Sequence, residues 1–362
     1  MATTLAAMRM PWWAWTWPLL GCALLAAAAA GVGGAIVALA SALALIATVF
    51  ASVYHAEVVA HRVGEPFGTL ILAFAVTVIE VALIVSIMLS GGTDTITLAR
   101  DTVFAAVMII CNGMVGICLL VGGVAHHEQG FQVQGASAAL AVLAVLTALT
   151  LILPNFTTSA PGPSYSVSQL AFDGAVSLVL YGAFVFAQTV KHRDYFLAEG
   201  EDEDVHAPAP SRRAALASGV LLFVSLVAVV GLAKKLSPAI ETAVARAGAP
   251  RAVVGVIIAA LVLLPEGLAA LRAAQANRLQ TSLNLALGSA LASIGLTIPA
   301  VAAASVLFDL PLALGLAPKE EVFLMVTIIL GVITLGTGRT TALQGMVHLV
   351  IFATFLFLAV VP

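Results

Sequence analysis

Long apolar runs separated by short polar segments follow one another along almost the whole chain. A helix needs about 20 apolar residues to cross a bilayer, and about eleven runs approach that length. Glycine, proline and charged residues bound these runs, as is typical of loops between helices. We expect membrane helices near residues 12–30, 34–55, 68–90, 100–122, 134–153, 168–189, 213–233, 251–273, 282–306, 320–337 and 341–361. The pattern predicts an all-α polytopic membrane protein with about eleven transmembrane helices.

The composition indicates that the lipid bilayer is the main partner of the chain. Of 362 residues, 62% are hydrophobic and only 9% are charged, whereas about 25% of the residues in soluble domains are charged. The net charge of -3 argues against nucleic acid as a partner. Cys22, Cys111 and Cys118 lie in apolar runs without metal-ligand or redox spacing. We therefore expect them to pack as small hydrophobic side chains, and we expect no resident cofactor.

The first apolar run has some features of a signal peptide, because Arg9 precedes an apolar and alanine-rich stretch. The second apolar run begins almost immediately after it, which favours a retained membrane helix. Tryptophan is enriched at membrane interfaces, so we interpret four residues near the start of this helix as interfacial anchors. They are Trp12, Trp13, Trp15 and Trp17.

One connection, residues 191–213, is both long and charged. Its acidic residues are Glu199, Glu201, Asp202, Glu203 and Asp204. Such a segment is either a solvated linker or a cytosolic cation sensor or gate. It predicts an extra N-terminal helix over residues 1–33, a first five-helix repeat over 34–190, the linker over 191–213 and a second repeat over 214–362. The distribution of Lys and Arg slightly favours a cytosolic N-terminus and a cytosolic linker.

Each predicted repeat carries one glutamate in the middle of its second helix, Glu80 in the first and Glu266 in the second. Because five is an odd number of crossings, the second repeat enters the membrane from the opposite side. Inverted repeats of this kind are common in secondary transporters, whose binding sites lie near the membrane midplane between the repeats. The pattern therefore predicts that the two glutamates converge from opposite halves.

A charged residue at the centre of a membrane helix costs about 2.5–3.5 kcal/mol on insertion scales. One such glutamate can be a protonated structural residue, but two at matching positions favour a function. Two converging carboxylates form a site of charge -2, which either one Ca²⁺ ion or two protons neutralise. Ca²⁺ prefers carboxylate and carbonyl oxygens. Competition between Ca²⁺ and protons at one site, combined with alternating access, is sufficient for obligatory exchange.

Several nearby residues offer further oxygen atoms. Thr77 lies one turn before Glu80 on the same face of its helix, and Asn112 lies in the following apolar run. Pro265 lacks an N–H group, which frees the carbonyl of Leu261 from its helical bond. In the second half, Ser289, Ser293 and Thr297 follow one another at four-residue steps on one helix face. The alternative for these hydroxyl residues is close packing of small side chains between membrane helices.

The remaining polar residues within apolar runs have structural explanations. Asp101 and Asp173 lie near predicted helix ends, where we expect solvation at the interface, and His348 is expected to be a core residue. The other histidines are predicted in or beside loops, without zinc-type spacing. They are His55, His61, His126, His127, His192 and His206.

Four stretches closely resemble the bacterial calcium/proton antiporters, the cation-exchanger branch of the Ca²⁺/cation antiporter superfamily. They are GEPFGTLILAFAVTVIEVALIVSIMLSGG, ARDTVFAAVMIICNGMVGICLLVGG, FQVQGASAALAVLAVL and LPEGLAALRAAQANRLQTSLNLALGSALASIGLTIP. The resemblance implies a ten-helix core of two inverted repeats with an added N-terminal helix, in a bacterial cytoplasmic (inner) membrane. It also implies that Glu80 and Glu266 are the paired acidic residues, and that cytosolic Ca²⁺, or in some members Na⁺ or K⁺, is exchanged for external protons.

The sequence departs from this family at one feature. Many relatives carry Gly-Asn shortly before each glutamate, where this chain has Val76-Thr77 and Val262-Leu263. Any ligand role of such an asparagine is absent here, and we hypothesise that Thr77, Asn112 and the break at Pro265 compensate for it. Ion preference and oligomeric state therefore stay open.

Three alternatives to a calcium/proton antiporter remain at this point. A monovalent Na⁺/H⁺ or K⁺/H⁺ antiporter would use the same carboxylates, although two acidic residues favour a divalent ion on charge balance. An intramembrane hydrolase would need Ser289 and His348 as a catalytic pair, but no orienting partner for His348 is visible. A passive channel would conduct without regard to an imposed pH gradient. We expect a transporter and not an enzyme.

Overall fold

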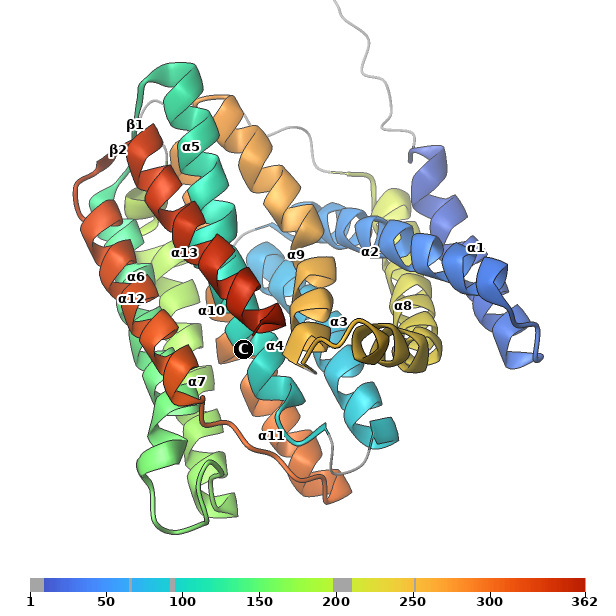
Figure 1. The fold of residues 1–362 in the computed structure, drawn as a ribbon. Coiled ribbons are helices and arrows are strands. Elements are labelled where there is room, and N and C mark those ends of the chain that lie inside the picture. Colours follow the sequence, from blue (N-terminus) through green and yellow to red (C-terminus); the bar gives the residue numbers. More distant parts are fainter. Residues whose placement is uncertain (1–9, 65–66, 92–94, 198–209, 251, 362) are drawn as a thin grey trace, which may run out of the picture. The chain divides into compact units, whose positions relative to one another are not determined.

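The computed structural model describes residues 10–64, 67–91, 95–197, 210–250 and 252–361, and almost all of its regular structure is helical (Figure 1). The α-helices are α1 (Trp12–Ala29), α2 (Ala35–Val63), α3 (Phe67–Gly91), α4 (Leu98–Met108), α5 (Val115–His126), α6 (Val133–Thr147), α7 (Val167–Phe186), α8 (Arg212–Arg246), α9 (Ala252–Gln275), α10 (Leu279–Gly295), α11 (Thr297–Phe308), α12 (Pro318–Leu335) and α13 (Ala342–Val360). The π-helices are η2 (Ile109–Met114), η3 (Ala148–Ile152) and η5 (Ala187–Lys191), and the 3₁₀-helices are η4 (Leu153–Phe156) and η6 (Arg193–Phe196). The strands are β1 (Glu128–Gly130) and β2 (Arg339–Thr341).

The predicted all-α membrane fold is confirmed. Within the described ranges, 10 helical stretches are long and apolar enough to cross a membrane. Helix α12 is also 18 residues long, but its first turn contains three charged residues, Lys319, Glu320 and Glu321. Counted together with the ten apolar stretches, it gives eleven membrane helices within the described ranges. Two predicted spans are interrupted near their middle: η2 separates α4 from α5, and Leu296 separates α10 from α11.

The described residues fall into two compact units. The first comprises Met1–Ile79 and Glu203–Pro238, and the second comprises Glu80–Asp202 and Ala239–Pro362. The boundaries fall within α3 and α8, so each of these helices contributes one segment to each unit. The acidic linker residues and His206 lie outside the described residues.

In the first unit, α1 packs along α2 and close to α8. A Cβ atom at Gly231 would overlap the side chain of Leu25, so glycine is required for this approach. The hydroxyl of Thr48 donates to the carbonyl of Trp17 at 3.2 Å. His55 was predicted in or beside a loop, and this was wrong: it is fully buried within α2, with Nε2 2.8 Å from the carbonyl oxygen of Ala14. The ring thus joins α2 to α1.

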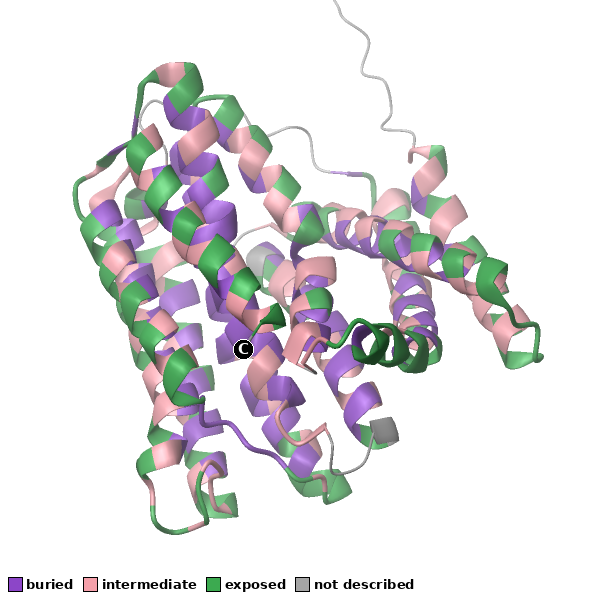
Figure 2. Ribbon diagram, in the orientation of Figure 1, coloured by how far each residue is buried: buried purple, intermediate pink, exposed green. Residues whose placement is uncertain are grey.

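The second unit is built around the two interrupted spans. In the most apolar 18-residue segment of each candidate span, the share of buried residues is highest for Leu98–His126, at 83%, and for Leu279–Phe308, at 67%. The buried residues of these spans stand out in Figure 2. Helix α9 packs against α4 and α10, α13 against α5, and α7 against α11. The interrupted helices therefore form the core of this unit, and the other helices surround them.

The last helix of each half begins with the same local structure, which supports the inverted repeat. Before α7, the backbone N–H of Ser166 donates to the Gln169 side chain at 2.9 Å, and before α13 that of Thr341 donates to the Gln344 side chain at 2.9 Å. These residues form S/T-x-x-Q capping boxes, which satisfy backbone donors at a helix start. The short antiparallel pair β1–β2, which the sequence did not predict, places Glu128 opposite Thr341.

Candidate functional site

Glu80 lies in the middle of α3 and is almost completely buried, with 2% of its surface exposed. The hydroxyl of Thr297 donates to Glu80 Oε2 at 2.8 Å. Ser293 also hydrogen-bonds to the Glu80 side chain. A buried carboxylate is tolerated only where hydrogen bonds or counter-charges replace water. The predicted burial of Glu80 is therefore observed, and its partners come from α10 and α11 of the other half.

The interruption between α10 and α11 positions these two hydroxyl groups. Pro299 has no N–H group, so the helical bond to the carbonyl of Gly295 is missing at this point. A Cβ atom at Gly295 would lie 2.9 Å from the Cβ atom of Tyr181 on α7, so only glycine fits here without a shift. Helix α11 thus begins at Thr297, close to α7, with its hydroxyl directed at Glu80.

Asn112 occupies the corresponding interruption in the first half. It is fully buried in the π-helix η2, and its Nδ2 donates to the Thr327 hydroxyl of α12 at 2.8 Å and to the Met108 sulfur at 3.8 Å. Among the described residues, its Oδ1 has no hydrogen-bond partner. A buried amide oxygen of this kind is suited to receive a cation or a water molecule. Thr327 was missed at the sequence level, because a single threonine in an apolar run carries no distinctive signal.

Glu266 lies half-buried in α9, next to Pro265. The adjacent Gly267 faces η2, since a Cβ atom there would lie 3.4 Å from the methyl group of Met114. Helix α9 packs against η2 as well as α4 and α5. Glu266 is therefore level with the interruption in the first half, just as Glu80 faces the interruption in the second half.

The hydrogen-bonded group of Glu80, Ser293 and Thr297 contains only part of the predicted site. Thr77 is buried one turn before Glu80, and Ser289 is half-buried one turn before Ser293. Within the described residues, neither joins this group by a side-chain hydrogen bond, and no three His, Cys, Asp or Glu side chains cluster as a metal cage. The convergence of Glu80 with Glu266, and the ligand roles of Thr77, Asn112 and Ser289, stay predictions.

Two other polar residues, His348 and Asp173, are both buried, but only the burial of His348 was predicted. His348 is buried, as expected for a core residue, and its Nε2 lies 3.1 Å from the hydroxyl of Thr334. Asp173 was expected to be solvated at the interface, and this was wrong: it is only 4% exposed. Its helix packs against α11, which removes the carboxylate from water.

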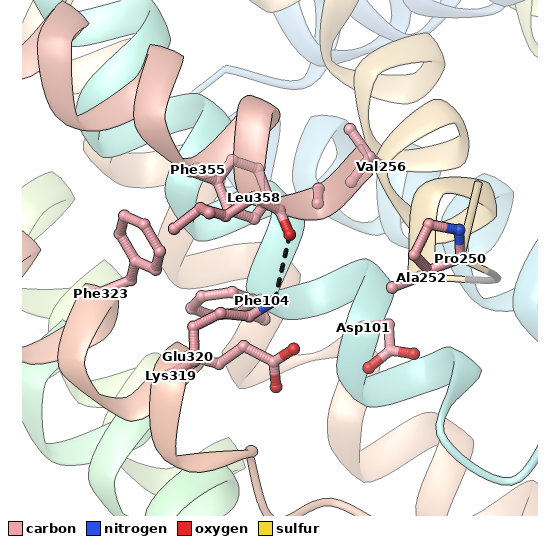
Figure 3. A pocket seen from close by; sticks show the side chains of 11 residues that line it. Asp101, Phe104, Pro250, Ala252, Val256, Lys319, Glu320, Phe323, Phe355 and Leu358 are labelled. Atoms are coloured by element: carbon pink, nitrogen blue, oxygen red, sulfur yellow. Dashed lines mark hydrogen bonds between the residues drawn. The ribbon is translucent and has the colours of Figure 1, made fainter. Parts of the chain in front are cut away.

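A cavity of about 160 Å³ lies in the second unit where α4, α9 and α12 begin and α13 ends (Figure 3). Its polar groups already have partners. Arg100 pairs with Asp101 at 2.9 Å, Glu320 accepts from the N–H of Ala317 at 2.9 Å, and Lys319 donates to the carbonyl of Leu358 at 3.1 Å. Apolar side chains, including three phenylalanines, line the remainder, so this cavity is not the ion site.

Two interrupted helices at the core of an inverted repeat, with one buried glutamate bonded to Thr297 and a second glutamate in the helix packed against η2, define a secondary transporter of the cation-exchanger fold. The chain belongs to the sodium/calcium exchanger protein family, which it matches over residues 15–190 and 217–361.

Two relatives agree with this assignment, and a solved structure has a similar fold. The chain is 53% identical over 360 residues to the "Putative ionic transporter y4hA" of Sinorhizobium fredii, covering 98% of this chain and 97% of that protein. It is 36% identical over 316 residues to the "Sodium-potassium/proton antiporter ChaA" of Escherichia coli, and the match covers 86% of this chain and 85% of that protein. Its fold is similar to the structure of native YfkE, with a TM-score of 0.74 and 16% sequence identity. That match covers 96% of this chain and 100% of the YfkE chain.

Proposed function

We propose that this chain is a cation/proton antiporter that exchanges Ca²⁺ for protons across a bacterial cytoplasmic membrane, with the linker on the cytosolic side. The observation that carries the proposal is the buried Glu80 carboxylate, which accepts a hydrogen bond of 2.8 Å from Thr297 on an interrupted helix of the other half. Glu266, in α9, is the second carboxylate of this proposal. In this proposal the two carboxylates bind the cation or protons, but not both together.

The chemistry of the site supports competition. Glu80 and Glu266 together provide at most two negative charges, and the other oxygens near Glu80 are neutral hydroxyl groups. In a low-dielectric environment an uncompensated charge of this size is strongly disfavoured. A Ca²⁺ ion balances both carboxylates, and so do two protons. The transporter is therefore least able to switch between its inward-facing and outward-facing states when the site is empty and both carboxylates are ionised. Because each switch needs bound Ca²⁺ or bound protons, the two fluxes are coupled.

Reconstituted protein tests the proposal directly. In liposomes with an imposed pH gradient, addition of Ca²⁺ should move protons in the wild-type protein and not in Glu80→Gln or Glu266→Gln. Both substitutions keep the side-chain volume and remove the charge. The matched control is Glu128→Gln, because Glu128 is exposed at the start of β1, so this variant should transport normally. Absence of cation-driven proton movement in folded wild-type protein would overturn the proposal.

A monovalent antiporter is the second candidate. It is favoured by the relative named a sodium-potassium/proton antiporter, at 36% identity. The absence of Gly-Asn before each glutamate is a second argument for it. Many calcium/proton antiporters have Gly-Asn there, whereas this chain has valine at the glycine position, Val76 and Val262. Adding Ca²⁺, Na⁺ and K⁺ in turn to the same liposomes separates the two candidates. A proton response to Na⁺ or K⁺ but not to Ca²⁺ would replace the calcium assignment while keeping both glutamates as the site.

A further inference from the structure

Helix α7 carries a second buried polar group that the exchange site described above does not use. Asp173 is 4% exposed, and Ser177, one turn later on the same face, is fully buried. Within the described part of the chain, Asp173 Oδ2 and the Ser177 hydroxyl have no hydrogen-bond partner. Unpaired polar atoms at fully buried positions are rare and disfavoured in native proteins. Two of them one helical turn apart therefore call for an explanation beyond packing.

The packing of α7 on α10 and α11 places these residues beside the exchange site. A Cβ atom at Gly174 would lie 3.6 Å from the Cβ atom of Pro299, and Tyr181 contacts Gly295. As residue numbers rise along α7 they fall along the partner, so the two segments run antiparallel. This register places Ser177 at the level of Thr297, between those two contacts. The hydroxyl of Thr297 in turn donates a hydrogen bond to Glu80 Oε2 at 2.8 Å.

The position of Asp173 along α7 indicates the direction of the path. With a rise of about 1.5 Å per residue, Asp173 lies about 9 Å along the axis from the first residue of α7. Ser177 lies one turn deeper, and α7 continues through η5 to Lys191, the beginning of the linker. The series from Asp173 through Ser177 to Thr297 therefore runs from the end of the unit that is remote from the linker towards Glu80.

Few ionisable groups surround Asp173. Helices α6, α10 and α11, which pack against α7, contain no acidic, basic, tyrosine or cysteine residue within their bounds. Tyr165, just before α7, is the ionisable group whose charge state responds to Asp173, and its hydroxyl donates to the carbonyl of Leu149 at 2.6 Å. Burial and the nearby carboxylate raise the pKa of Tyr165 to about 12, so it stays protonated. A single carboxylate with hydroxyl groups also offers too few oxygens for Ca²⁺.

We propose that Asp173 and Ser177 form a proton relay between the outer side of the membrane and Glu80; this inference rests on the proposed function. A proton leaves the carboxyl group of Asp173 for the Ser177 oxygen through an intervening water molecule, because these two groups are not directly hydrogen-bonded. A proton passes from Ser177 to Thr297 in the same way, and the Thr297 proton moves to Glu80 along the hydrogen bond of 2.8 Å. Each hydroxyl gives up one proton and gains one, so the net result is one proton on Glu80 and an Asp173 carboxylate, which regains a proton from the outer side, about 9 Å away along α7. Hydroxyl groups suit this role because they both donate and accept.

The test compares two transport modes in proteoliposomes. Cation/proton exchange needs the relay, whereas exchange of labelled Ca²⁺ for unlabelled Ca²⁺ across the membrane moves no net proton. If Na⁺ or K⁺ is the ion carried by the wild type, its labelled form replaces Ca²⁺. In Asp173→Asn we expect proton-coupled exchange to slow by about tenfold or more, while cation/cation exchange stays within about twofold. Ser177→Ala, which removes one unpaired oxygen and should fold normally, is expected to show a smaller loss in the same mode.

Asp309→Asn is the matched control. It makes the same chemical change at the exposed end of α11, where the left-handed backbone (φ 51°) tolerates asparagine. It should leave both modes unchanged. Equal losses of both modes in Asp173→Asn, or no loss in either mode, would overturn the relay. A wild-type protein that carries the cation without protons would overturn the proposed function as well, so the two failures are distinguishable.

Discussion

The two halves of the chain interrupt their central helix in different ways. In the second half, α10 ends at Gly295 and α11 begins at Thr297, and Pro299 removes one helical donor. In the first half, the helix continues through the π-helix η2, which holds Asn112 without a proline. π-Helical turns within α-helices are often found at functional sites. One interruption thus presents hydroxyl groups to a carboxylate, and the other presents an amide.

This difference indicates that the two glutamates are not equivalent. Glu80 is 2% exposed and its carboxylate is oriented by Thr297, so its position is defined by the protein. Glu266 is half-buried in a helix that contains Pro265. Pro265 lacks the N–H group that would bond to the carbonyl of Leu261, so the backbone beside Glu266 can shift more easily than the unbroken helix around Glu80. We therefore interpret Glu80 as the more rigid and Glu266 as the more adaptable of the two carboxylates.

The largest expected effect comes from shortening each glutamate by one methylene group. Glu80→Asp withdraws the carboxylate by about 1.5 Å and breaks its bond with Thr297. In Glu266→Asp, a shift of the backbone at the Pro265 break can compensate for the shorter side chain. A hydrogen bond to a charged group contributes about 1.5–3 kcal/mol, which corresponds to about tenfold to hundredfold in affinity. We expect that loss in Glu80→Asp and a smaller one in Glu266→Asp, measured as the cation concentration at half-maximal proton movement. Equal losses would contradict the distinction between the two carboxylates.

Removing the hydroxyl partner of Glu80 sharpens the same comparison. Thr297→Val keeps the shape of the side chain and removes the donor, so we expect the half-saturation concentration to rise by about tenfold. Thr297→Ser keeps the hydroxyl and serves as the control, with a value close to that of the wild type. Cation titrations of proton movement at fixed pH measure both variants. A serine variant as impaired as the valine variant would show that packing of the methyl group, and not the hydrogen bond, is decisive.

Glycines at the two interruptions provide a comparison on stability. A Cβ atom at Gly295 would lie 2.9 Å from Tyr181 Cβ, which is tied to the backbone, whereas one at Gly113 would lie 3.0 Å from the ring edge of Phe352, which can rotate. Overpacking costs about 1–3 kcal/mol. We expect Gly295→Ala to fall in this range and Gly113→Ala below it, by thermal unfolding in detergent. The reverse order would mean that the π-helix is the more rigid interruption.

Most of the fold was predictable because the bilayer imposes a strong constraint on the sequence. A membrane helix needs a long apolar run, so the spans could be identified without knowledge of their packing. Glu80 and Glu266 could be singled out as candidates for the same reason, since a carboxylate is conspicuous in such a run. The series from Ser289 to Thr297 was visible as a pattern, and two of its three members lie against Glu80.

The parts that escaped prediction depend on contacts between distant segments. The π-helix at Asn112 has no sequence signature, and its partner Thr327 comes from a helix far along the chain. Asp173 was expected at the interface because it lies near the start of an apolar run. The capping box at Ser166 fixes where α7 begins, and packing against α11 covers the carboxylate, so its environment follows from tertiary structure and not from its position in the run.

The smallest expected effect concerns Thr77, which is buried one turn before Glu80. If its hydroxyl contributes a weak neutral ligand, Thr77→Val should raise the half-saturation concentration for the cation by about threefold, since a neutral hydrogen-bonding group contributes about 0.5–1.5 kcal/mol. The change should be smaller than that in Thr297→Val, because Thr297 contacts the carboxylate directly. Unchanged transport in Thr77→Val would remove Thr77 from the site. The hydroxyl ligands of Glu80 would then come from α10 and α11 alone, which would make the two halves still less equivalent.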